Sequence, residues 1–391
     1  MKSVAVLGGG PAGAFTAEKL ARAGVKTYLF DEKLAWEKPC GGGVTYKAYH
    51  EYPFLFDNAT PKMLIRAAEM GAPNAGRVKL SFPQPMLIYS RRDLNQMLLD
   101  RAAAAGAVLD KTRVLAMEPL SANSAGGWNV RTKGSAVTVD YCVVATGARN
   151  PLRNAGVEFG PGDTMSTLGY YVEGEQEHLE IEFLEGFQGY IWVFPRQGHF
   201  SVGIGGKGEP AHALRKRLEG FMDRRGMRRK DAVFYSHMLP SLGTSSWNRN
   251  RVAGPGWLAV GDAAGLVDPI TGEGIYYALR SADLASRVLR DESCPDKAAG
   301  YREALAGDFL HDLAYASTLS KRVYLGRYFS GGVPQRMVQL VRRSPRFRAI
   351  VQDLFAGTQP YLTLRERLRG NVRGTMLEIA GSFVRPGRVA G

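Results

Sequence analysis

Cysteines and metal-binding patterns are scarce in this sequence. Its 391 residues include three cysteines, Cys40, Cys142 and Cys294, an odd number without any CxxC or His-Cys spacing. This argues against both a disulfide framework and a structural zinc site. The six histidines show no paired spacing, and no GxSxG motif marks a hydrolase nucleophile. We therefore expect no metal, and neither hydrolase nor metalloenzyme chemistry.

Long apolar runs are missing as well. No window contains the roughly 18 apolar residues that a membrane-spanning helix needs. The N-terminus leads directly into a short apolar strand and shows no secretory signal. We expect a cytoplasmic protein, and peripheral attachment to the inner face of a membrane is compatible with this expectation.

Acidic residues are depleted near the C-terminus. Residues 301–391 contain 15 Arg and Lys against 6 Asp and Glu, within a chain of formal net charge +14. Such an excess of positive charge can attract nucleic acid, anionic lipid or an acidic protein. Alternatively, the charged side chains only keep the helix faces solvated. No nucleic-acid motif accompanies the arginines, so we expect no nucleic-acid partner. The interleaved apolar residues favour a membrane surface instead: Tyr324, Tyr328, Phe329, Phe347, Phe355 and Tyr361. The oligomeric state is left open.

The first thirty residues have the pattern of a βαβ unit. An apolar strand at 3–7 and a second at 26–30 flank a glycine turn at 8–13 and a helix at 14–23. Farther along, a helix is expected at 93–105, strands at 108–117, 128–131, 137–145 and 257–260, and a long helix at 274–290. These segments predict a Rossmann-type α/β domain.

A different pattern occupies the middle of the chain. Between 168 and 206, aromatic-rich strands at 179–183, 190–194 and 200–204 alternate with glycine turns, and a helix at 211–225 follows. This predicts an antiparallel sheet that forms a second domain. After Pro295 the sequence is mainly helical, with breaks at 331–332, Pro345 and Pro360.

The glycine turn carries the first sign of chemistry. Gly8, Gly10 and Gly13 form GxGxxG between strand and helix, where the backbone can approach a pyrophosphate and the helix N-terminus favours its negative charge. Asp31 ends the second strand and would accept hydrogen bonds from an adenosine ribose. We expect a dinucleotide here, bound by Gly8, Gly10, Pro11, Ala12, Gly13, Asp31 and Glu32.

Two distant segments favour FAD over NAD. Residues 145–153 follow a buried strand and resemble the second flavin motif of para-hydroxybenzoate hydroxylase-type proteins, although Thr146 replaces the usual aspartate before Gly147. Residues 261–275 closely resemble the third. The resemblance implies that Asp262, after Gly261, binds the ribityl or pyrophosphate region. It also implies that backbone amides near Gly272, Gly274 and Ile275 face the isoalloxazine and stabilise its anionic reduced form.

Two further residues are assigned to the cofactor, and one motif is rejected. Arg91 matches an arginine of the same fold that reaches the FAD phosphates, and Val114 is expected beside the cofactor. Residues 203–208 also spell GxGxxG, but Pro210 and the missing acidic strand end argue against a second dinucleotide site. The external electron donor is therefore a transiently docking NAD(P)H or a reduced carrier protein such as ferredoxin.

Two more segments narrow the resemblance to one family. Lys38-Pro39-Cys40-Gly41-Gly42-Gly43 and Tyr190-Ile191-Trp192-Val193-Phe194-Pro195 resemble motifs of the geranylgeranyl reductase flavoproteins, which reduce prenyl double bonds. The resemblance implies that Cys40, Gly41 and Gly42 lie beside the flavin. It also implies that Tyr190, Trp192, Phe194 and Pro195 line a cavity for a hydrophobic prenyl substrate.

Prenyl reduction requires a proton donor, because an isolated alkene has no carbonyl to accept electron density when the flavin delivers hydride. The thiol of Cys40, with an ordinary pKa of about 8.5, could donate this proton. Tyr190 or a bound water is the alternative donor. The face of Trp192 could stabilise positive charge on the alkene. Cys40 could equally be a small buried residue of its loop, and the three aromatic residues could simply form a sheet core.

Two other functions compete with an FAD-dependent reductase of carbon-carbon double bonds. A flavin monooxygenase or halogenase has WxWxIP strands that resemble 190–195, although Tyr190 and Phe194 depart from that pattern. Lys79 lies at about the depth of a halogenase lysine. A membrane-associated electron-carrier flavoprotein is the third possibility.

The expected fold is α/β: a Rossmann-type FAD-binding domain interleaved with an antiparallel-sheet substrate domain, followed by a C-terminal helical region. We expect the FAD-binding domain at 1–60, 86–165 and 240–295, the substrate domain at 61–85 and 166–239, and the helical region at 296–391.

Overall fold

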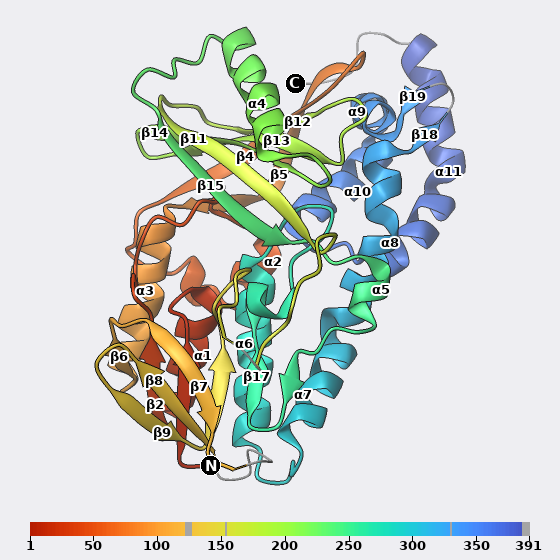
Figure 1. Ribbon diagram of the computed structural model, residues 1–391. Helices are drawn as coiled ribbons and strands as arrows, with labels where there is room; N and C mark the ends of the chain where they lie inside the picture. The colour runs from red at the N-terminus through yellow and green to blue at the C-terminus, as the bar shows by residue number, and fades with distance from the viewer. Residues whose placement is uncertain (122–126, 153–154, 329–330, 385–391) are drawn as a thin grey trace. The chain divides into compact units, whose positions relative to one another are not determined.

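The computed structural model describes residues 1–121, 127–152, 155–328 and 331–384 (Figure 1). Arg153 and Phe329, which belong to segments discussed above, lie outside these ranges. The chain forms two compact units, and each is assembled from three separate segments. Unit 1 contains Met1–Lys38, Arg91–Thr164 and Met238–Ala314, and unit 2 contains Pro39–Ser90, Met165–His237 and Tyr315–Gly391.

Unit 1 is built around a six-stranded sheet with β1 (Ser3–Leu7) near its centre. The strand order is β16-β17-β10-β1-β2-β6. β1 pairs in parallel with β10 (Tyr141–Val144) and β2 (Lys26–Phe30), which match the buried apolar strands predicted from the sequence. β6 (Val108–Asp110), β16 (Ala253–Gly254) and β17 (Trp257–Ala259) complete the sheet. The parallel strands confirm the Rossmann-type prediction.

Helices flank this sheet within unit 1. α1 (Pro11–Arg22) packs against α3 (Arg91–Ala104) and α6 (Ile275–Arg290), and α7 (Lys297–Leu305) packs against α6. Tyr301 of α7 is fully buried, and its hydroxyl donates to the carbonyl of Ala259 at 3.0 Å. This packing attaches α7 to unit 1, so the predicted C-terminal region 296–391 is divided between the two units.

A second, three-stranded sheet of unit 1 changes the interpretation of residues 137–145. β7 (Val114–Pro119), β8 (Trp128–Thr132) and β9 (Ala136–Val139) form it, whereas β10 begins two residues after β9 and joins the six-stranded sheet. The predicted single strand is therefore two strands. Asp140 separates them, and its carboxylate accepts a hydrogen bond from the backbone N–H of Ser3 at 2.9 Å.

Unit 2 contains an eight-stranded sheet of order β15-β11-β14-β13-β12-β4-β5-β3. The strands are β3 (Gly43–Val44), β4 (Lys62–Ala72), β5 (Gly76–Tyr89), β11 (Thr164–Glu173), β12 (Leu179–Phe183), β13 (Gly189–Arg196), β14 (His199–Gly206) and β15 (Val233–Pro240). Most pairs are antiparallel, as predicted, but β12 runs parallel to β4. The sheet is therefore mixed.

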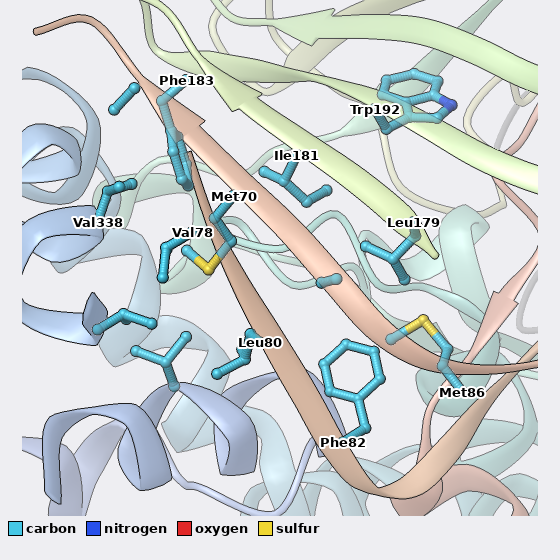
Figure 2. Close-up of a cluster of buried hydrophobic side chains, with 14 of the residues drawn as sticks. Met70, Val78, Leu80, Phe82, Met86, Leu179, Ile181, Phe183, Trp192 and Val338 are labelled. Atoms are coloured by element: carbon cyan, nitrogen blue, oxygen red, sulfur yellow. The ribbon is translucent and has the colours of Figure 1, made fainter. Parts of the chain in front are cut away.

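The two faces of this sheet bury different cores. Ile191 and Val193 face α4 (Ala211–Arg224), whose Leu214 and Leu218 are fully buried. Trp192 points to the opposite face, in a cluster with Met70 and Ile181 that also includes Val338 of α9 (Val333–Arg343) and Val351 of α10 (Pro345–Ala356). Figure 2 shows Trp192 at one end of this cluster and Val338 at the other. The C-terminal helices therefore cover the aromatic face.

The remaining elements are short except for two helices. They are α2 (Tyr46–Glu51), η1 (Pro53–Leu55), α5 (Thr244–Trp247), η2 (Gly261–Ala264), η3 (Ala306–Leu310), α8 (His311–Leu325), β18 (Arg327–Tyr328), β19 (Gly331–Gly332) and α11 (Tyr361–Val384). Helices dominate after Pro295, as the sequence predicts.

The boundaries of the units differ from the predicted domains in residues 39–60 and 86–90. Both segments were expected in the FAD-binding domain but belong to unit 2. The physical reason is backbone pairing, since β3 joins the edge of the large sheet beside β5 and the N–H of Tyr89 donates to the carbonyl of Gly42 at 2.9 Å. Only Met1–Lys38 of the predicted segment 1–60 remains with the Rossmann-type sheet.

Candidate active site

The glycine turn of unit 1 forms a tight loop before α1. A Cβ built on Gly13 would lie 1.9 Å from the carbonyl oxygen of Gly8, so only glycine allows helix and loop to approach this closely. A Cβ on Gly10 would meet no atom within 4 Å. α1 begins at Pro11, and the N–H groups of Ala12 and Gly13 lie in its first turn, where no intrahelical acceptor exists. The loop thus offers amide donors and open space, as a pyrophosphate requires.

Asp31 organises the same loop. Its Oδ2 accepts from the N–H of Gly9 at 2.7 Å, and its Oδ1 accepts from the N–H groups of Lys33 and Leu34 at 2.7 and 2.8 Å. A carboxylate has about four lone-pair positions, so Oδ2 retains acceptor capacity for a ribose hydroxyl. Glu32, also predicted for the cofactor, is exposed next to it.

Asp262 follows Gly261 in η2, which packs directly on α1. A Cβ on Gly261 would lie 2.9 Å from the Cβ of Ala12, so the third flavin segment and the glycine turn are neighbours. The Oδ2 of Asp262 pairs with the Nζ of Lys38 at 2.9 Å, and both side chains are largely shielded from solvent. Lys38 fixes the carboxylate, and it is a site residue that the sequence analysis did not assign.

The turn before α6 is held by Asp268. Its Oδ1 accepts from the N–H groups of Ile270 and Thr271 at 2.7 and 3.0 Å, and its N–H donates to the carbonyl of Glu273. Gly272 lies inside this turn, and Gly274 caps α6, which begins at Ile275. The turn thereby presents the N-terminus of α6 as the flavin resemblance implies, with the amides predicted to face the isoalloxazine.

Arg91 begins α3 and is buried, with an exposed fraction of 4%. Its Nη2 donates to Asn95 at 3.3 Å, while its Nε is buried without a hydrogen-bond partner. Glu37 caps this helix by accepting from the N–H groups of Arg91 and Arg92 at 3.0 and 3.1 Å. A buried guanidinium nitrogen without an acceptor is costly, which fits a site for a phosphate ligand.

The second flavin segment adjoins β1. The N–H of Ala145 donates to the carbonyl of Leu7, so Thr146 and Gly147 continue from the strand next to the glycine turn. The Thr146 hydroxyl donates to Asn150 at 3.3 Å, so this side chain braces its own loop. Val114 is half-buried at the start of β7. Arg153 lies outside the described residues.

The Cys40 loop is held against the large sheet of unit 2. The carbonyl of Cys40 accepts from Arg196 Nη2 at 2.7 Å and from the Ser201 hydroxyl at 3.1 Å. Burial raises the pKa of the Tyr235 phenol, which stays protonated and lies 2.9 Å from Ser201 Oγ. The N–H of Gly42 donates to Cys40 Sγ at 3.3 Å. These contacts fix both the backbone and the sulfur of Cys40.

The aromatic strand β13 presents Tyr190, Trp192 and Phe194 on one face, as predicted from their alternation. Trp192 is 8% exposed and packs in the core, whereas Tyr190 and Phe194 are half-buried. A Cβ on Gly41 would lie 2.6 Å from the Phe194 ring, so the Cys40 loop and this face are in contact. Pro195 pairs with Phe200 and falls on the opposite face by alternation, away from the predicted cavity lining.

A small pocket continues from Phe194 along the same face. Met86 Sδ and the Phe194 ring both approach Gly43, within 3.3 Å of its built Cβ. Met86 also lines a pocket of about 120 Å³ between β5 and α10, together with Tyr46, Phe82, Pro83, Gln84, Pro85, Gln352, Asp353, Phe355, Ala356 and Thr358. Most of these side chains are apolar, so the pocket extends the aromatic face toward α10.

The structure also places Lys79, which was named for the halogenase alternative, and the GxGxxG motif that the sequence analysis rejects. Lys79 is exposed on β5, and because Val78 and Leu80 point into the aromatic core, Lys79 points away from the face that carries Trp192. The second GxGxxG motif begins inside β14 rather than in a strand-to-helix turn. There Gly203 leaves room for the Trp192 ring, since a Cβ would lie 2.2 Å from Trp192 Cζ2.

The sequence analysis missed several residues that hold the site together. Glu37, Lys38, Arg196, Ser201 and Tyr235 act through contacts with segments far away in the sequence. Lys38 is the first residue of the Cys40 motif, and this position was the one available signal. Burial raises the pKa of the Cys142 thiol, so this side chain stays protonated in the strand core.

Residues 1–121, 127–152, 155–328 and 331–384 contain neither a cluster of metal ligands nor a membrane-spanning helix. There, no group of three or more His, Cys, Asp or Glu side chains could hold a metal ion. Among the same residues, no helix is both long and apolar enough to cross a bilayer.

Comparison with known proteins connects these features to a family. Residues 2–173 match the family model described as pyridine nucleotide-disulphide oxidoreductase. A digeranylgeranylglycerophospholipid reductase of Methanothermobacter thermautotrophicus is 32% identical over 73% of this chain and 77% of its own. A menaquinone reductase of Mycolicibacterium smegmatis is 29% identical over 86% of this chain and 89% of its own.

A solved structure shares the fold. The geranylgeranyl bacteriochlorophyll reductase-like protein of Thermoplasma acidophilum superposes with a TM-score of 0.77 at 22% identity, over 95% of this chain and 99% of its own. The agreement covers nearly the whole chain and confirms the predicted α/β architecture.

Proposed function

Because this chain belongs to the geranylgeranyl reductase family of FAD-dependent oxidoreductases, we propose that it saturates carbon-carbon double bonds of a prenyl lipid or a prenyl quinone. The relatives described above carry names of both substrate kinds. The observation that supports this most is the half-buried apolar face of Tyr190 and Phe194, which contacts the Cys40 loop and continues into an apolar pocket.

The residues of unit 1 fit FAD. The Ala12 and Gly13 amides and the buried Arg91 Nε would receive the pyrophosphate, and Asp31 would receive a ribose hydroxyl. Asp262, held by Lys38, and the first turn of α6 would hold the ribityl and ring portions. Bound FAD, once reduced, supplies two electrons and one of the two hydrogens that each double bond takes up.

The second hydrogen of each double bond has to arrive as a proton. We propose that Cys40 donates it to the prenyl carbon, with Tyr190 or a bound water as the alternative donor. Arg196 and Ser201 hold the Cys40 backbone so that the sulfur keeps one position. Trp192, packed against Gly203, would present its ring to positive charge that develops on the alkene.

We further propose that the prenyl chain follows the aromatic face and ends in the pocket beside α10. A cavity of roughly 150 Å³ accepts a benzene molecule, so a pocket of about 120 Å³ is suited to one five-carbon isoprene unit. The electrons come from NAD(P)H or from a reduced carrier protein. The basic C-terminal region would attract a membrane in which such substrates reside.

The first experiment is anaerobic. The FAD-loaded protein is reduced with dithionite and mixed with a geranylgeranyl lipid or a polyprenyl quinone while the oxidised flavin absorbance is followed. We expect this absorbance to return only with the prenyl substrate, and the product to gain two hydrogens per double bond. Return of the absorbance only on adding air would favour an oxygen-using enzyme. Fast return with a protein carrier and no small-molecule product would favour electron transfer.

The proton donor is tested with Cys40→Ser and Tyr190→Phe. If Cys40 donates the proton, Cys40→Ser slows the reoxidation by about 100-fold while FAD stays bound, because a positioned general acid contributes typically that much. Tyr190→Phe serves as the matched variant. A large effect of Tyr190→Phe with none of Cys40→Ser would transfer the role to Tyr190.

A further inference from the structure

Helix α11 (Tyr361–Val384) turns a line of apolar side chains outward. Leu368, Val372 and Met376 follow one another at four-residue intervals, and their exposed fractions are 36%, 48% and 52%. Leu377 follows Met376 in the chain but lies on a different side of the helix, and it is 74% exposed. Residues four apart lie on one side of a helix, so Leu368, Val372 and Met376 form a continuous apolar row on the surface.

The inner side of α11 is attached by polar contacts instead. Glu378 accepts a hydrogen bond from the Ser344 hydroxyl and pairs with Arg346 at 3.3 Å. Arg367 pairs with Asp353 at 2.7 Å, which joins α11 to α10. A surface helix of a globular protein normally buries its apolar side, so α11 shows the reverse arrangement. An exposed apolar row of this kind indicates a binding surface.

A second row on α11 is cationic and runs beside the apolar one. Arg365, Arg369 and Arg373 also follow at four-residue intervals, and all three are exposed. In the part of the chain that the structure describes, none of the three forms an ion pair. Three guanidinium groups therefore flank the apolar row without an ion-pair partner among the described residues.

The combination of the two rows identifies the partner. We propose that the outward face of α11 docks on an anionic lipid bilayer, with Leu368, Val372 and Met376 entering the interfacial region and Arg365, Arg369 and Arg373 binding lipid phosphates. Helices that lie in a membrane interface combine these two kinds of side chain, and each Arg near an anionic leaflet adds to the attraction.

A second copy of the chain would be a poorer partner for this surface. Each copy carries a formal net charge of +14, and pairing through α11 would bring the same arginine row from both copies into one interface. A bilayer containing anionic lipid neutralises these charges while accepting the apolar row. The inference rests on the proposed function in one respect, since a prenyl lipid substrate is itself a membrane component.

The test is sedimentation of the full-length, FAD-loaded protein with vesicles. One vesicle type contains phosphatidylcholine alone, and the other contains phosphatidylcholine and phosphatidylglycerol in equal parts. We expect binding to the anionic vesicles, reduced about tenfold by the double variant Arg369→Gln/Arg373→Gln and by Val372→Gln/Met376→Gln. The control Arg224→Gln/Arg228→Gln removes the same charge from exposed positions elsewhere and should bind like the unmodified chain.

The results separate this inference from the proposed function. Equal binding to both vesicle types, or unchanged binding of the α11 variants, would overturn the docking surface. A dimer that dissociates in the α11 variants would also overturn it, in favour of self-association. Turnover of a detergent-dispersed prenyl substrate should persist in the α11 variants, whereas failure of the unmodified chain to turn it over would contradict only the proposed function.

Discussion

Gly13 and Gly10 belong to the same GxGxxG motif, but a Cβ at Gly13 would clash with the backbone whereas a Cβ at Gly10 would enter open space. This difference gives a prediction. Gly13→Ala forces a methyl group against the Gly8 carbonyl, so the FAD-free protein should lose about 1–3 kcal/mol of unfolding free energy. Gly10→Ala enters open space and should change that free energy by less than about 0.5 kcal/mol. Both variants should bind FAD more weakly, because Gly10 faces the proposed pyrophosphate.

Denaturant unfolding of the FAD-free proteins and a fluorescence titration with FAD measure the two effects. Undiminished FAD affinity of Gly10→Ala would mean that the cofactor does not approach this loop. Equal stability of the two variants would contradict the close contact of Gly13 with Gly8.

Arg91 gives a second prediction at the scale of single residues. Hydrogen bonds to charged groups contribute about 1.5–3 kcal/mol, so Arg91→Met should raise the FAD dissociation constant by about tenfold or more. The FAD-free protein should lose little stability, because the variant removes a buried nitrogen that has no partner together with one long hydrogen bond to Asn95. Arg92→Met is the matched control, since Arg92 is the exposed neighbour in the same helix turn.

A calorimetric titration with FAD decides the point. If Arg91→Met and Arg92→Met bind FAD equally well, the buried guanidinium serves the packing of α3 rather than a phosphate.

The local backbone geometry of the proposed site residues was predictable from the sequence where a motif encodes a turn. Gly13, Asp31 and Gly272 belong to turns whose shape depends on neighbouring residues. The local sequence pattern therefore predicts where these residues lie. Ser201 and Lys38 were not predictable in this way. Each acts on a residue more than a hundred positions away, and no local pattern records that contact.

Strands, like single residues, were predictable where their position depends on local sequence and not where it depends on distant partners. The bounds of β1, β2 and β12 agree with the sequence analysis, because short apolar or alternating segments between turn residues define strands locally. The segment 137–145 was predicted as one strand, since apolar character continues on both sides of Asp140. Which sheet a strand joins depends on partners such as Ser3, and hydrophobic periodicity contains no information about them.

The pocket between β5 and α10 supports a prediction at the scale of elements. Ala356→Phe would add a ring to the pocket beside Phe355 and Met86. If the end of the prenyl chain lies there, activity should fall at least tenfold with a twenty-carbon chain, because each buried carbon of the displaced isoprene unit contributes about 0.8 kcal/mol of binding. A ten-carbon chain should react as before. Ala103→Phe, at an exposed position of α3, controls for an added surface ring.

Initial rates of flavin reoxidation with the two chain lengths provide the measurement. Equal losses with both chains would show that the added ring disturbs α10 itself. Unchanged rates with both would show that the substrate does not reach this pocket.

At the scale of the whole molecule, the interleaving of segments limited prediction of the domain boundaries. The chain passes between the two units five times. No change in amino-acid composition marks two of these passages, after Lys38 and after Ala314. The second of them falls inside α8. The antiparallel sheet and the Rossmann-type sheet were nevertheless recognisable, because each has its own hydrophobic periodicity.

The same interleaving predicts that the first 173 residues cannot act alone, although the family model matches this region. The fragment lacks β17, which pairs with β10, and α6, whose first turn adjoins α1 through Gly261. It also lacks Asp262, so it has neither a complete sheet nor the third part of the cofactor site.

We expect a purified fragment 1–173 to be colourless after incubation with FAD and to bind a hydrophobic dye strongly, because one face of α1 and the edge of β10 are uncovered. The full chain treated in the same way should be yellow and bind little dye. A folded fragment that retains FAD would show that the glycine turn and Arg91 suffice for binding, and that the residues after 238 serve only catalysis and packing.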